Sequence, residues 1–270
     1  MGDRANVIVV RESGEHELYY SKSAVDIDLD LLHGPEGLLS SLSRARRDDW
    51  WLDDLMAEAG ILADFHHKVL LCFVWEGPTA ELRYRQVALE LIRAAWPGWE
   101  FRWLYDGATE LREYLGLDPE FVRRRPSDPE EPSFMGPDDE NLPDLDDWGY
   151  VVTVGTDRVH LGPADIIDHP VQYGPALLDL LAVAPTHGAS RRWATSGVHL
   201  DPARRFLGWW TLGNVPRAYE VPARWPGWTA EFWQDDWQAH VRASGGLFSP
   251  APFDPDEARA EVLERLRERR

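Results

Sequence analysis

The tetrapeptide Trp96-Pro97-Gly98-Trp99 recurs as Trp225-Pro226-Gly227-Trp228, and the match continues in register to Asp106 and Asp235. Tryptophan is frequent in this chain, with 14 copies in 270 residues. Even so, a match of this kind arises by chance at only about one position in 100,000. The sequence therefore predicts two copies of one ancestral unit.

Three further matches lie upstream of these tryptophans, in the same order in both copies. The matched segments are 7–10 with 151–154, 33–35 with 173–175, and 60–70 with 197–207. Their offset changes along the chain, as insertions in loops would produce. The copies differ most at residues 212–224, where Pro216 and Pro222 interrupt the helical pattern that residues 84–95 show in the first copy. This difference predicts that one helix has been lost.

Each copy shows the pattern of a hairpin, a helix, a hairpin, a helix and a strand. In the first copy, β-rich runs around turns predict hairpins within residues 7–20 and 60–75. Apolar residues at helical spacing predict helices from Gly34 and over residues 84–95. Alternating aromatic residues predict a strand at 101–105. We therefore predict an α+β fold of two pseudo-symmetric copies with mainly antiparallel sheet.

A short helix is predicted to follow that strand in the first copy. Asp106 stands where an N-cap residue is expected, and Leu111 and Leu115 follow at helical spacing. Gly116 is the predicted stop.

Composition sets the domain boundaries. Residues 126–147 contain five prolines and nine acidic residues without a basic one, which predicts an exposed, irregular linker. It divides a first repeat at 1–125 from a shortened second repeat at 148–245. Residues 246–270 form an extension in which Asp254 and Pro255 predict the start of a helix. Its narrow apolar stripe suits docking onto the body of the protein or onto a partner.

The net charge is −19 and is unevenly distributed. Residues 1–125 carry 15 basic and 23 acidic side chains, and residues 148–270 carry 13 and 15. Such a balance repels phosphate backbones and anionic lipids, so we expect neither nucleic acid nor a membrane as a partner. With no apolar run near the length of a membrane span and no signal-peptide pattern, the sequence predicts a cytoplasmic protein. The single cysteine, Cys72, lies in an apolar run and is predicted to be a buried thiol.

The common catalytic and cofactor-binding motifs are absent, and we predict no cofactor and no catalytic residue. Asp26, Asp28 and Asp30 alternate with apolar residues. If this stretch is extended, the three carboxylates share one face, where Mg²⁺ or Ca²⁺ would find oxygen ligands. The alternative is a charged edge strand or loop that resists aggregation. We favour the second interpretation and predict no metal site.

The histidines show no spacing that indicates a metal site or a catalytic pair. His66 and His67 precede a predicted strand, where adjacent side chains point to opposite faces and cannot easily share a metal ion. They are predicted to be turn histidines. Folding could still bring histidines of the second copy beside aspartates as acid–base pairs. The residues concerned are His160, His169, His187 and His199, with Asp165, Asp168 and Asp201.

Tryptophans at repeated positions are predicted to belong to the core of both copies. Trp50, Trp51 and Trp148 have no certain counterpart and are candidates for anchors at a protein interface. Trp193 matches Trp51 only weakly.

We expect a non-catalytic acidic binding protein, of immunity or inhibitor type, that engages a basic protein. The alternative is an enzyme or small-molecule binder with a pocket between the repeats that uses histidine and aspartate side chains. The predicted partner-binding residues are Asp26, Asp28, Asp30, Trp50, Trp51, Asp138, Asp139, Glu140, Asp144, Asp146, Asp147 and Trp148.

The opening Gly2-Asp3-Arg4-Ala5-Asn6-Val7 and the repeated Trp-Pro-Gly-Trp with its flanking hairpin carry a further resemblance. Over most of its length the chain resembles a family of internally duplicated hypothetical proteins of GC-rich actinobacteria, to which no function is assigned. The resemblance supports the duplication and a cytoplasmic setting. It implies no site residue.

Overall fold

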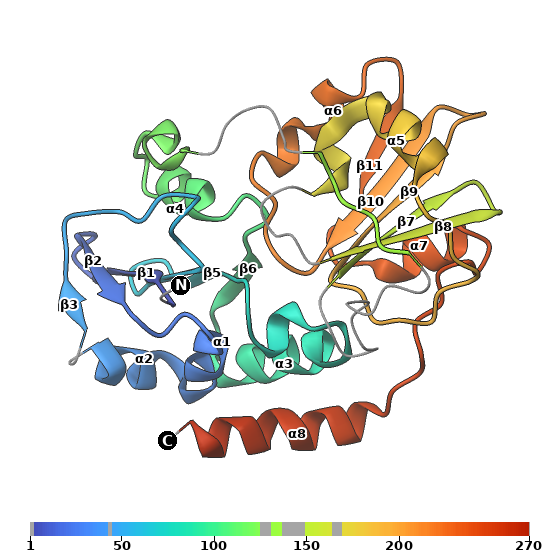
Figure 1. Cartoon of the computed structure of the whole chain (residues 1–270). Helices are drawn as coiled ribbons and strands as arrows, with labels where there is room; N and C mark the ends of the chain where they lie inside the picture. The colour runs from blue at the N-terminus through green and yellow to red at the C-terminus, as the bar shows by residue number, and fades with distance from the viewer. Residues whose placement is uncertain (1–2, 43–44, 125–130, 137–148, 164–168, 270) are drawn as a thin grey trace. The chain divides into compact units, whose positions relative to one another are not determined.

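The computed structural model describes residues 3–42, 45–124, 131–136, 149–163 and 169–269. The chain forms two compact units, one of residues 1–125 with 253–270 and the other of residues 126–252. Each unit contains one mixed β-sheet and several helices (Figure 1). The predicted α+β class and the two similar copies are therefore confirmed.

Two antiparallel hairpins form the middle of the first sheet. They are β1 (Ala5–Val10) with β2 (His16–Ser21), and β4 (Ala59–Asp64) with β5 (Val69–Val74). β1 pairs with β4 in parallel, and β6 (Glu100–Trp103) extends the sheet in parallel beyond β5. The short β3 (Arg46–Arg47) completes the order β3-β2-β1-β4-β5-β6. Antiparallel pairing thus joins the strands within each hairpin and also β2 with β3, whereas helical crossovers make the β1–β4 and β5–β6 pairings parallel.

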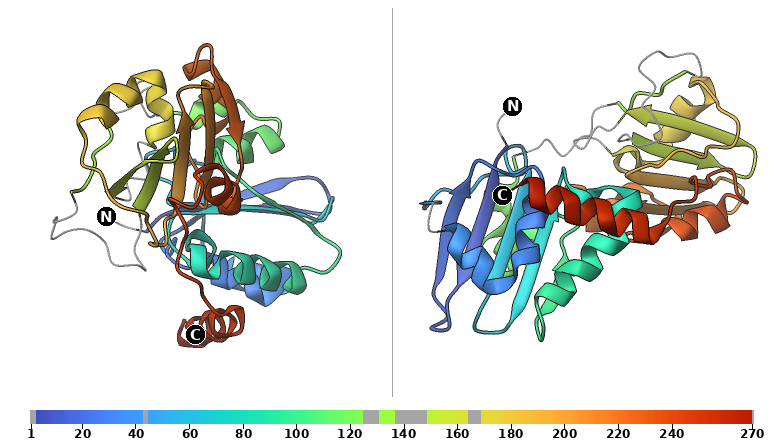
Figure 2. Two further views of the ribbon diagram at one scale, coloured as in Figure 1. Left: turned by 90° about the vertical axis from the view of Figure 1, so that its right-hand side faces the viewer. Right: turned by 90° about the horizontal axis from the view of Figure 1, so that it is seen from below.

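Helices cover both faces of the first sheet (Figure 2). α2 (Gly34–Leu42) and α3 (Leu82–Ala95) pack on the face of Val7 and Val9, and α4 (Ala108–Tyr114) packs on the face of Ile8. Because both faces are covered, β1, β4 and β5 are buried along their whole length and read as nearly continuous apolar runs. The shorter helices are α1 (Ile27–Asp30), η1 (Leu31–His33), η2 (Pro78–Ala80) and η3 (Pro119–Val122).

The second unit repeats this arrangement with shorter helices. Its sheet has the order β11-β10-β9-β7-β8, with the same pairing directions as the equivalent strands of the first sheet. The strands are β7 (Gly149–Val154), β8 (Arg158–Pro163), β9 (Ser196–Asp201), β10 (Phe206–Thr211) and β11 (Thr229–Phe232). The helices are η4 (Pro170–Ala176), α5 (Leu177–Val183), η5 (Ala218–Glu220), α6 (Val221–Arg224) and α7 (Trp237–Ala243).

Trp96 and Trp225 occupy equivalent environments, as the repeat predicts. Each side chain is 1% exposed and follows the last residue of its helix, with backbone angles of −117° and 62° in one case and −115° and 63° in the other. Their indole N–H groups donate to the carbonyl oxygens of Leu31 and Val171, both at 2.7 Å. The repeated tetrapeptide therefore fixes the same junction of helix and sheet twice.

Two predictions within the repeats need correction. The helix expected to be lost at residues 212–224 is shortened instead, to η5 and the single turn α6, because Pro222 fits the first turn of a helix and cannot lie inside one. Asp106 does not cap α4, whose N-cap is Gly107. Its carboxylate instead accepts two hydrogen bonds from Arg123, at 2.6 and 3.2 Å, and both side chains are nearly buried.

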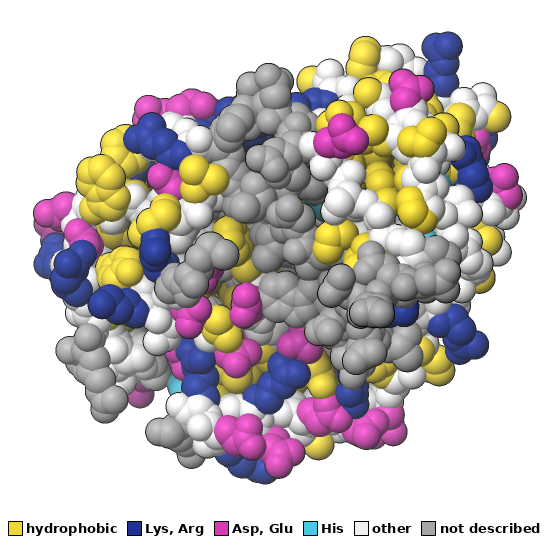
Figure 3. Space-filling model, viewed as in Figure 1, with side chains coloured by type: hydrophobic (Ala, Val, Ile, Leu, Met, Phe, Trp, Pro, Cys, Tyr) yellow, Lys and Arg dark blue, Asp and Glu magenta, His cyan; other side chains and the backbone are white. Residues whose placement is uncertain are grey.

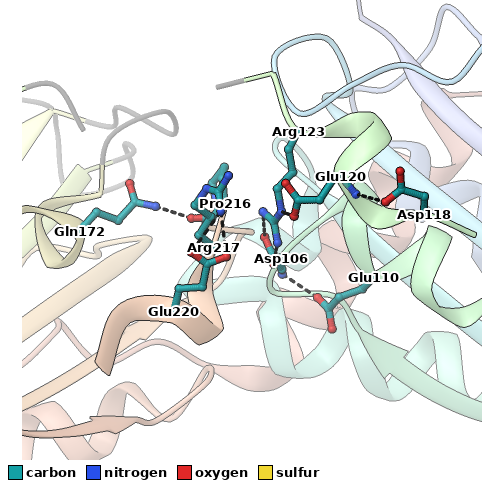
Figure 4. Close-up of polar contacts among 9 residues, drawn as sticks. All are labelled: Asp106, Glu110, Asp118, Glu120, Arg123, Gln172, Pro216, Arg217 and Glu220. Carbon is teal, nitrogen blue, oxygen red and sulfur yellow. Dashed lines mark hydrogen bonds and ion pairs between the residues drawn. The ribbon is translucent and has the colours of Figure 1, made fainter. Parts of the chain in front are cut away.

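Figure 4 shows the surroundings of this ion pair, where the backbone N–H of Asp106 donates to Glu110 and Arg123 also contacts Glu120. The same view also draws contacts within the second unit. There Gln172 of η4 donates to the carbonyl oxygen of Pro216, and Arg217 pairs with Glu220 across the start of η5.

Residues 131–136 belong to the segment predicted to be an exposed linker, and they lie against the edge of β8. The backbone N–H of Met135 donates to the carbonyl oxygen of Leu161 at 2.8 Å, and the Met135 side chain is buried. Phe134 packs edge-on against Tyr150. The burial of Met135 and this ring packing correct the prediction that residues 131–136 are exposed. The remainder of residues 126–147 lies outside the described residues.

The helix α8 (Pro255–Glu268) belongs to the first unit, although it follows the second unit in sequence. It begins as predicted, with the side chain of Asp254 accepting from the backbone N–H of Asp256. Its buried residues Ala258 and Val262 pack with Leu29, Tyr84 and Val87. Ion pairs flank this seam, namely Arg83–Glu261, Arg265–Glu81 and Arg269–Asp30. The stripe predicted for this helix therefore docks within the protein.

We expect Gly34→Ala to lower the free energy of unfolding by about 2 kcal/mol or more, because Gly34 has φ 70° and ψ −171°, a region that almost only glycine adopts. An added Cβ would also lie 2.7 Å from the carbonyl oxygen of Ala95. Urea denaturation measures the loss. The matched control is Gly14→Ala, since Gly14 also has positive φ but no atom within 4 Å of an added Cβ. Equal losses in the two variants would show that the Ala95 contact contributes nothing.

Candidate functional site

The aspartates at 26, 28 and 30 do not share one face of a strand. Asp26 precedes the short helix α1, and Asp28 and Asp30 lie within it. Asp30 is held by Arg269 at 3.0 Å. Among the described residues, no group of three or more metal-ligating side chains is placed to hold a metal ion. The sheet-edge geometry that would have suited a cation is therefore absent here.

Asp28 is buried and engaged inside the first unit. Its carboxylate accepts hydrogen bonds from the backbone N–H and the hydroxyl of Thr79, at 2.7 and 2.6 Å. Burial raises the pKa of Asp28 to about 6 and outweighs these hydrogen bonds, which lower it. Gly77 packs so closely that an added Cβ would lie 2.4 Å from this carboxylate. Asp28 is thus unavailable to a partner, which corrects the prediction.

The adjacent tryptophans Trp50 and Trp51 differ in the exposure of their side chains. The Trp51 side chain is 7% exposed and packs in the core beside α4, whereas Trp50 is 68% exposed. Successive side chains of an extended segment point in opposite directions, so one of the pair enters the core and the other faces solvent. Trp51 is therefore an internal support and not the surface anchor that the sequence predicted.

The segment that carries Trp50 is irregular but firmly held. Asn6 of β1 holds this segment at Leu52. The side-chain amide of Asn6 donates to the Leu52 carbonyl oxygen at 2.9 Å and accepts from the Leu52 N–H at 3.0 Å. The backbone N–H of Asp54 donates to the carbonyl oxygen of Val122 at 2.9 Å. The side chain of Asp54 accepts from the backbone N–H of Arg124. Such fixation reduces the entropy that a bound partner would otherwise have to remove.

Exposed apolar side chains gather around this segment. Among the described residues, six large hydrophobic side chains are exposed, and four of them are Trp50, Leu55, Met56 and Phe121. Arg112 links Phe121 to the segment, because its guanidinium lies over the rings of both Trp51 and Phe121, at 5.0 and 4.6 Å from their centroids. Figure 3 shows hydrophobic side chains on the surface over α4, with charged side chains of both signs among them.

We define the Trp50 surface as these four exposed side chains together with the acidic residues of the same segment. Residues 48–58 contain five carboxylates and no basic side chain. Some of this charge is balanced locally, as Arg46 pairs with Asp48 and Arg124 lies 3.9 Å from Asp53. The carboxylates of the Trp50 surface are Asp48, Asp49, Asp53, Asp54 and Glu58.

The second unit does not repeat this combination. Its connection into β9 contains Arg191-Arg192-Trp193, so basic residues stand before the tryptophan instead of acidic ones. The indole N–H of Trp193 donates to the carbonyl oxygen of Ala251 at 2.8 Å, and the ring is partly buried. What the two copies share is needed for their common scaffold, whereas the Trp50 surface is particular to the first copy.

The second unit instead has a hydrogen-bonded polar chain in its core, which the sequence analysis did not foresee. The Trp210 indole N–H donates to Nδ1 of His240 at 3.0 Å. Because indole can only donate, the other nitrogen of His240 carries the proton and donates to the Thr153 hydroxyl at 2.7 Å. That hydroxyl is then free to donate to Nδ1 of His199 at 2.9 Å. Burial lowers the pKa of both histidines, which keeps them neutral.

Apolar side chains occupy the equivalent positions of the first unit. An added Cβ at Gly60 would contact Phe73 and Leu111, and one at Gly197 would contact Trp210 and His240. Strand pairing sets Ile8 opposite Leu62 and Thr153 opposite His199. Ile8 therefore corresponds to Thr153, which shifts the predicted match of residues 7–10 with 151–154 by one position. The sequence signal that could have indicated the polar chain is the replacement of apolar core residues of the first copy by polar residues in the second.

The other histidines that the sequence analysis names hold loops or lie in apolar surroundings. His66 and His67 lie in the turn between β4 and β5, where His67 pairs with Asp64 at 2.9 Å. His160 binds the carbonyl oxygen of Pro185, and His187 binds that of Met135. His169 is buried beside Trp209, and burial lowers its pKa to about 3. Of their predicted acid–base partners, Asp165 and Asp168 lie outside the described residues, and Asp201 accepts a hydrogen bond from the backbone N–H of Arg204.

Several other predicted residues also lie outside the described part of the chain. They are Asp138, Asp139, Glu140, Asp144, Asp146, Asp147 and Trp148. Cys72, in contrast, is a free and fully buried thiol, and burial raises its pKa. Of the helices that the structure describes, none is both long and apolar enough to cross a membrane.

Comparison of the chain with protein-family models, with curated proteins and with solved structures found no match. The resemblance to a duplicated actinobacterial family therefore stays a prediction.

Proposed function

We propose that the protein is a non-catalytic binding protein that engages a basic protein partner through the Trp50 surface. The observation that carries the proposal is Trp50 itself, 68% exposed on a segment whose backbone N–H groups at Leu52 and Asp54 are hydrogen-bonded. Exposed tryptophan on a fixed support is typical of residues that dominate binding energy at interfaces. An inhibitor or an immunity protein that occupies a basic protein would use such a surface.

Charge supports the choice of partner. The chain has a net charge of −19, and the segment around Trp50 contributes five carboxylates and no base. Residues 126–147 contribute nine further acidic residues to the negative charge of the chain. An acidic surface attracts a basic protein over distances of about a Debye length and raises the rate of encounter. The apolar side chains would then provide the contact that resists dissociation.

The test begins with capture of partners from native cell extract, using the wild-type protein and Trp50→Ala as paired baits. We expect a protein of net positive charge to be retained by the wild type and depleted by the substitution. With that protein purified, Trp50→Ala should weaken binding by about 30-fold, mainly through faster dissociation, because central aromatic anchors contribute about 2 kcal/mol. The matched control is Val183→Ala in the second unit, where Val183 is 86% exposed.

Charge is tested separately with Asp49→Asn and Asp53→Asn, which keep the side-chain shape. These variants and added salt should slow association and leave dissociation nearly unchanged. The control is Asp157→Asn, an exposed acid of the second unit. Equal binding of the captured protein to Trp50→Ala and Val183→Ala would show that the Trp50 surface is not its binding site. So would an association rate that neither salt nor the aspartate substitutions change.

A further inference from the structure

A pocket of about 550 Å³ opens in the first unit, between α2 and the strands β1, β2 and β3. It is separate from the Trp50 surface, and none of the residues of that surface lines it. Its volume lies in the range of sites that hold small organic molecules. α2 and β2, which form its two sides, are seen in Figure 1.

The floor of the pocket is apolar and preformed. Val7, Ile27 and Leu38 line it from three different elements, and each side chain is at most 4% exposed. All three belong to the core cluster that joins α2 to the sheet. Their positions are therefore fixed by packing that does not depend on a ligand. An alkyl chain entering the pocket would cover the partly exposed side chains of Tyr20 and Ala45, which line the pocket beside this floor, without rearrangement of the core.

The rim of the pocket is polar and carries one unbalanced positive charge. Two of its charged residues are already paired, as Asp30 is held by Arg269 and Arg46 by Asp48. Lys22 forms no ion pair with any residue that the structure describes. The hydroxyls of Ser21, Ser23 and Ser41 also line the rim. A cation beside hydroxyl donors is suited to an anionic oxygen group.

The second copy lacks the polar rim at matching positions, because Gly162 stands at the place of Ser21 and the next residue, Pro163, at that of Lys22. Strand pairing makes Leu161 the equivalent of Tyr20, which lines the pocket. Met135 bonds to Leu161 along the edge of β8, where Arg46 pairs with Tyr20 in the first unit. The chemistry of the pocket is therefore not a by-product of the shared scaffold.

We propose that this pocket binds an amphipathic carboxylate, with its alkyl chain on the floor of Val7, Ile27 and Leu38 and its carboxylate at Lys22. The acyl chain supplies affinity by burial, and Lys22 with the neighbouring hydroxyls selects the anionic end. The ligand class is a medium-length straight-chain carboxylic acid or an acyl group of the same shape.

The experiment titrates sodium octanoate into the full-length protein, followed by calorimetry and by NMR of isotope-labelled protein. We expect saturable binding with one site per chain and shifted signals for Val7, Ile27 and Leu38. Sodium hexanoate should bind about 15-fold more weakly, because each buried methylene contributes about fourfold. Octylammonium, with the same chain and the opposite charge, should bind more weakly than octanoate.

The chain offers a matched pair of variants, because Lys22 and Lys68 are its only lysines. Lys22→Glu should weaken octanoate binding about tenfold or more. It should also reduce the difference in affinity between octanoate and octylammonium. Lys68→Glu makes the same change of net charge in the turn between β4 and β5 and should have little effect. Absence of saturable octanoate binding, affinity independent of chain length, or equal effects of the two substitutions would each overturn the proposal.

Discussion

Trp96→Ala is expected to lower the free energy of unfolding of the first unit by about 3–5 kcal/mol, and Trp225→Ala to lower that of the second unit by a similar amount. Both side chains are 1% exposed, so truncation leaves a large cavity. It also leaves a buried carbonyl oxygen, at Leu31 or Val171, without its indole donor. Urea denaturation followed by NMR signals from each unit measures both losses.

Trp50→Ala is the matched control for these two variants, because it removes the same side chain from an exposed position. Its effect on stability should stay within about 0.5 kcal/mol. Equal losses for Trp50→Ala and Trp96→Ala would contradict the assignment of surface and core. If Trp225→Ala lowers the free energy of unfolding far less than Trp96→Ala does, the two copies share this geometry but the tryptophan stabilises them to different extents.

Acidification from pH 7 to pH 4 is expected to destabilise the second unit by about 3 kcal/mol through His169 alone. In the folded state the pKa of His169 is about 3, against an ordinary value of 6.5. As pH falls below 6.5, His169 is protonated in the unfolded chain but stays neutral in the folded chain, so the free energy of unfolding decreases. It stops decreasing only near pH 3. His199 and His240 shift in the same direction and add to the loss.

Asp28 gives the first unit an opposite contribution over part of this range. Its folded pKa of about 6 lies above its ordinary value of 3.8, so the folded state takes up a proton first as pH falls. Stability from this group therefore rises between pH 6 and pH 4. Asp28→Asn should abolish that rise.

Denaturation at pH 7, 5.5 and 4, read separately from NMR signals of each unit, tests the contrast. A four-site variant supplies the control, with Thr153→Ile, His199→Leu, Trp210→Phe and His240→Leu. It gives the second unit the core residues of the first and should reduce its sensitivity to acid, leaving the part due to His169. If both units of the wild-type protein lose stability in parallel, the buried histidines do not govern the response.

The sequence predicts the scaffold well because the scaffold depends on local patterns that occur twice. Apolar periodicity predicts the hairpins and α3, and the repeated tetrapeptide marks the junction at Trp96. The interior chemistry was harder to predict. Asp26, Asp28 and Asp30 alternate as in a strand but lie at and within the short helix α1, and the hydrogen-bond partner of Asp28 is Thr79, far away in sequence. Alternation alone cannot reveal such a partner.

The histidine chain of the second unit illustrates the same limit. His199 and His240 meet only because of the register of β9 and the placement of α7 against it. No spacing in the sequence encodes that meeting. Trp50 and Trp51 are likewise indistinguishable by type, and the hydrogen bonds of Asn6 to Leu52 decide which one enters the core.

The position of α8 affects how the protein folds during synthesis. This helix covers Leu29, Tyr84 and Val87 of the first unit, yet the ribosome makes it only after the whole second unit. At about 5–20 residues per second, the delay between α3 and α8 is roughly 10–30 s. During that time the nascent first unit presents an uncovered apolar strip, so chaperones that recognise such strips have an opportunity to bind before the helix closes it.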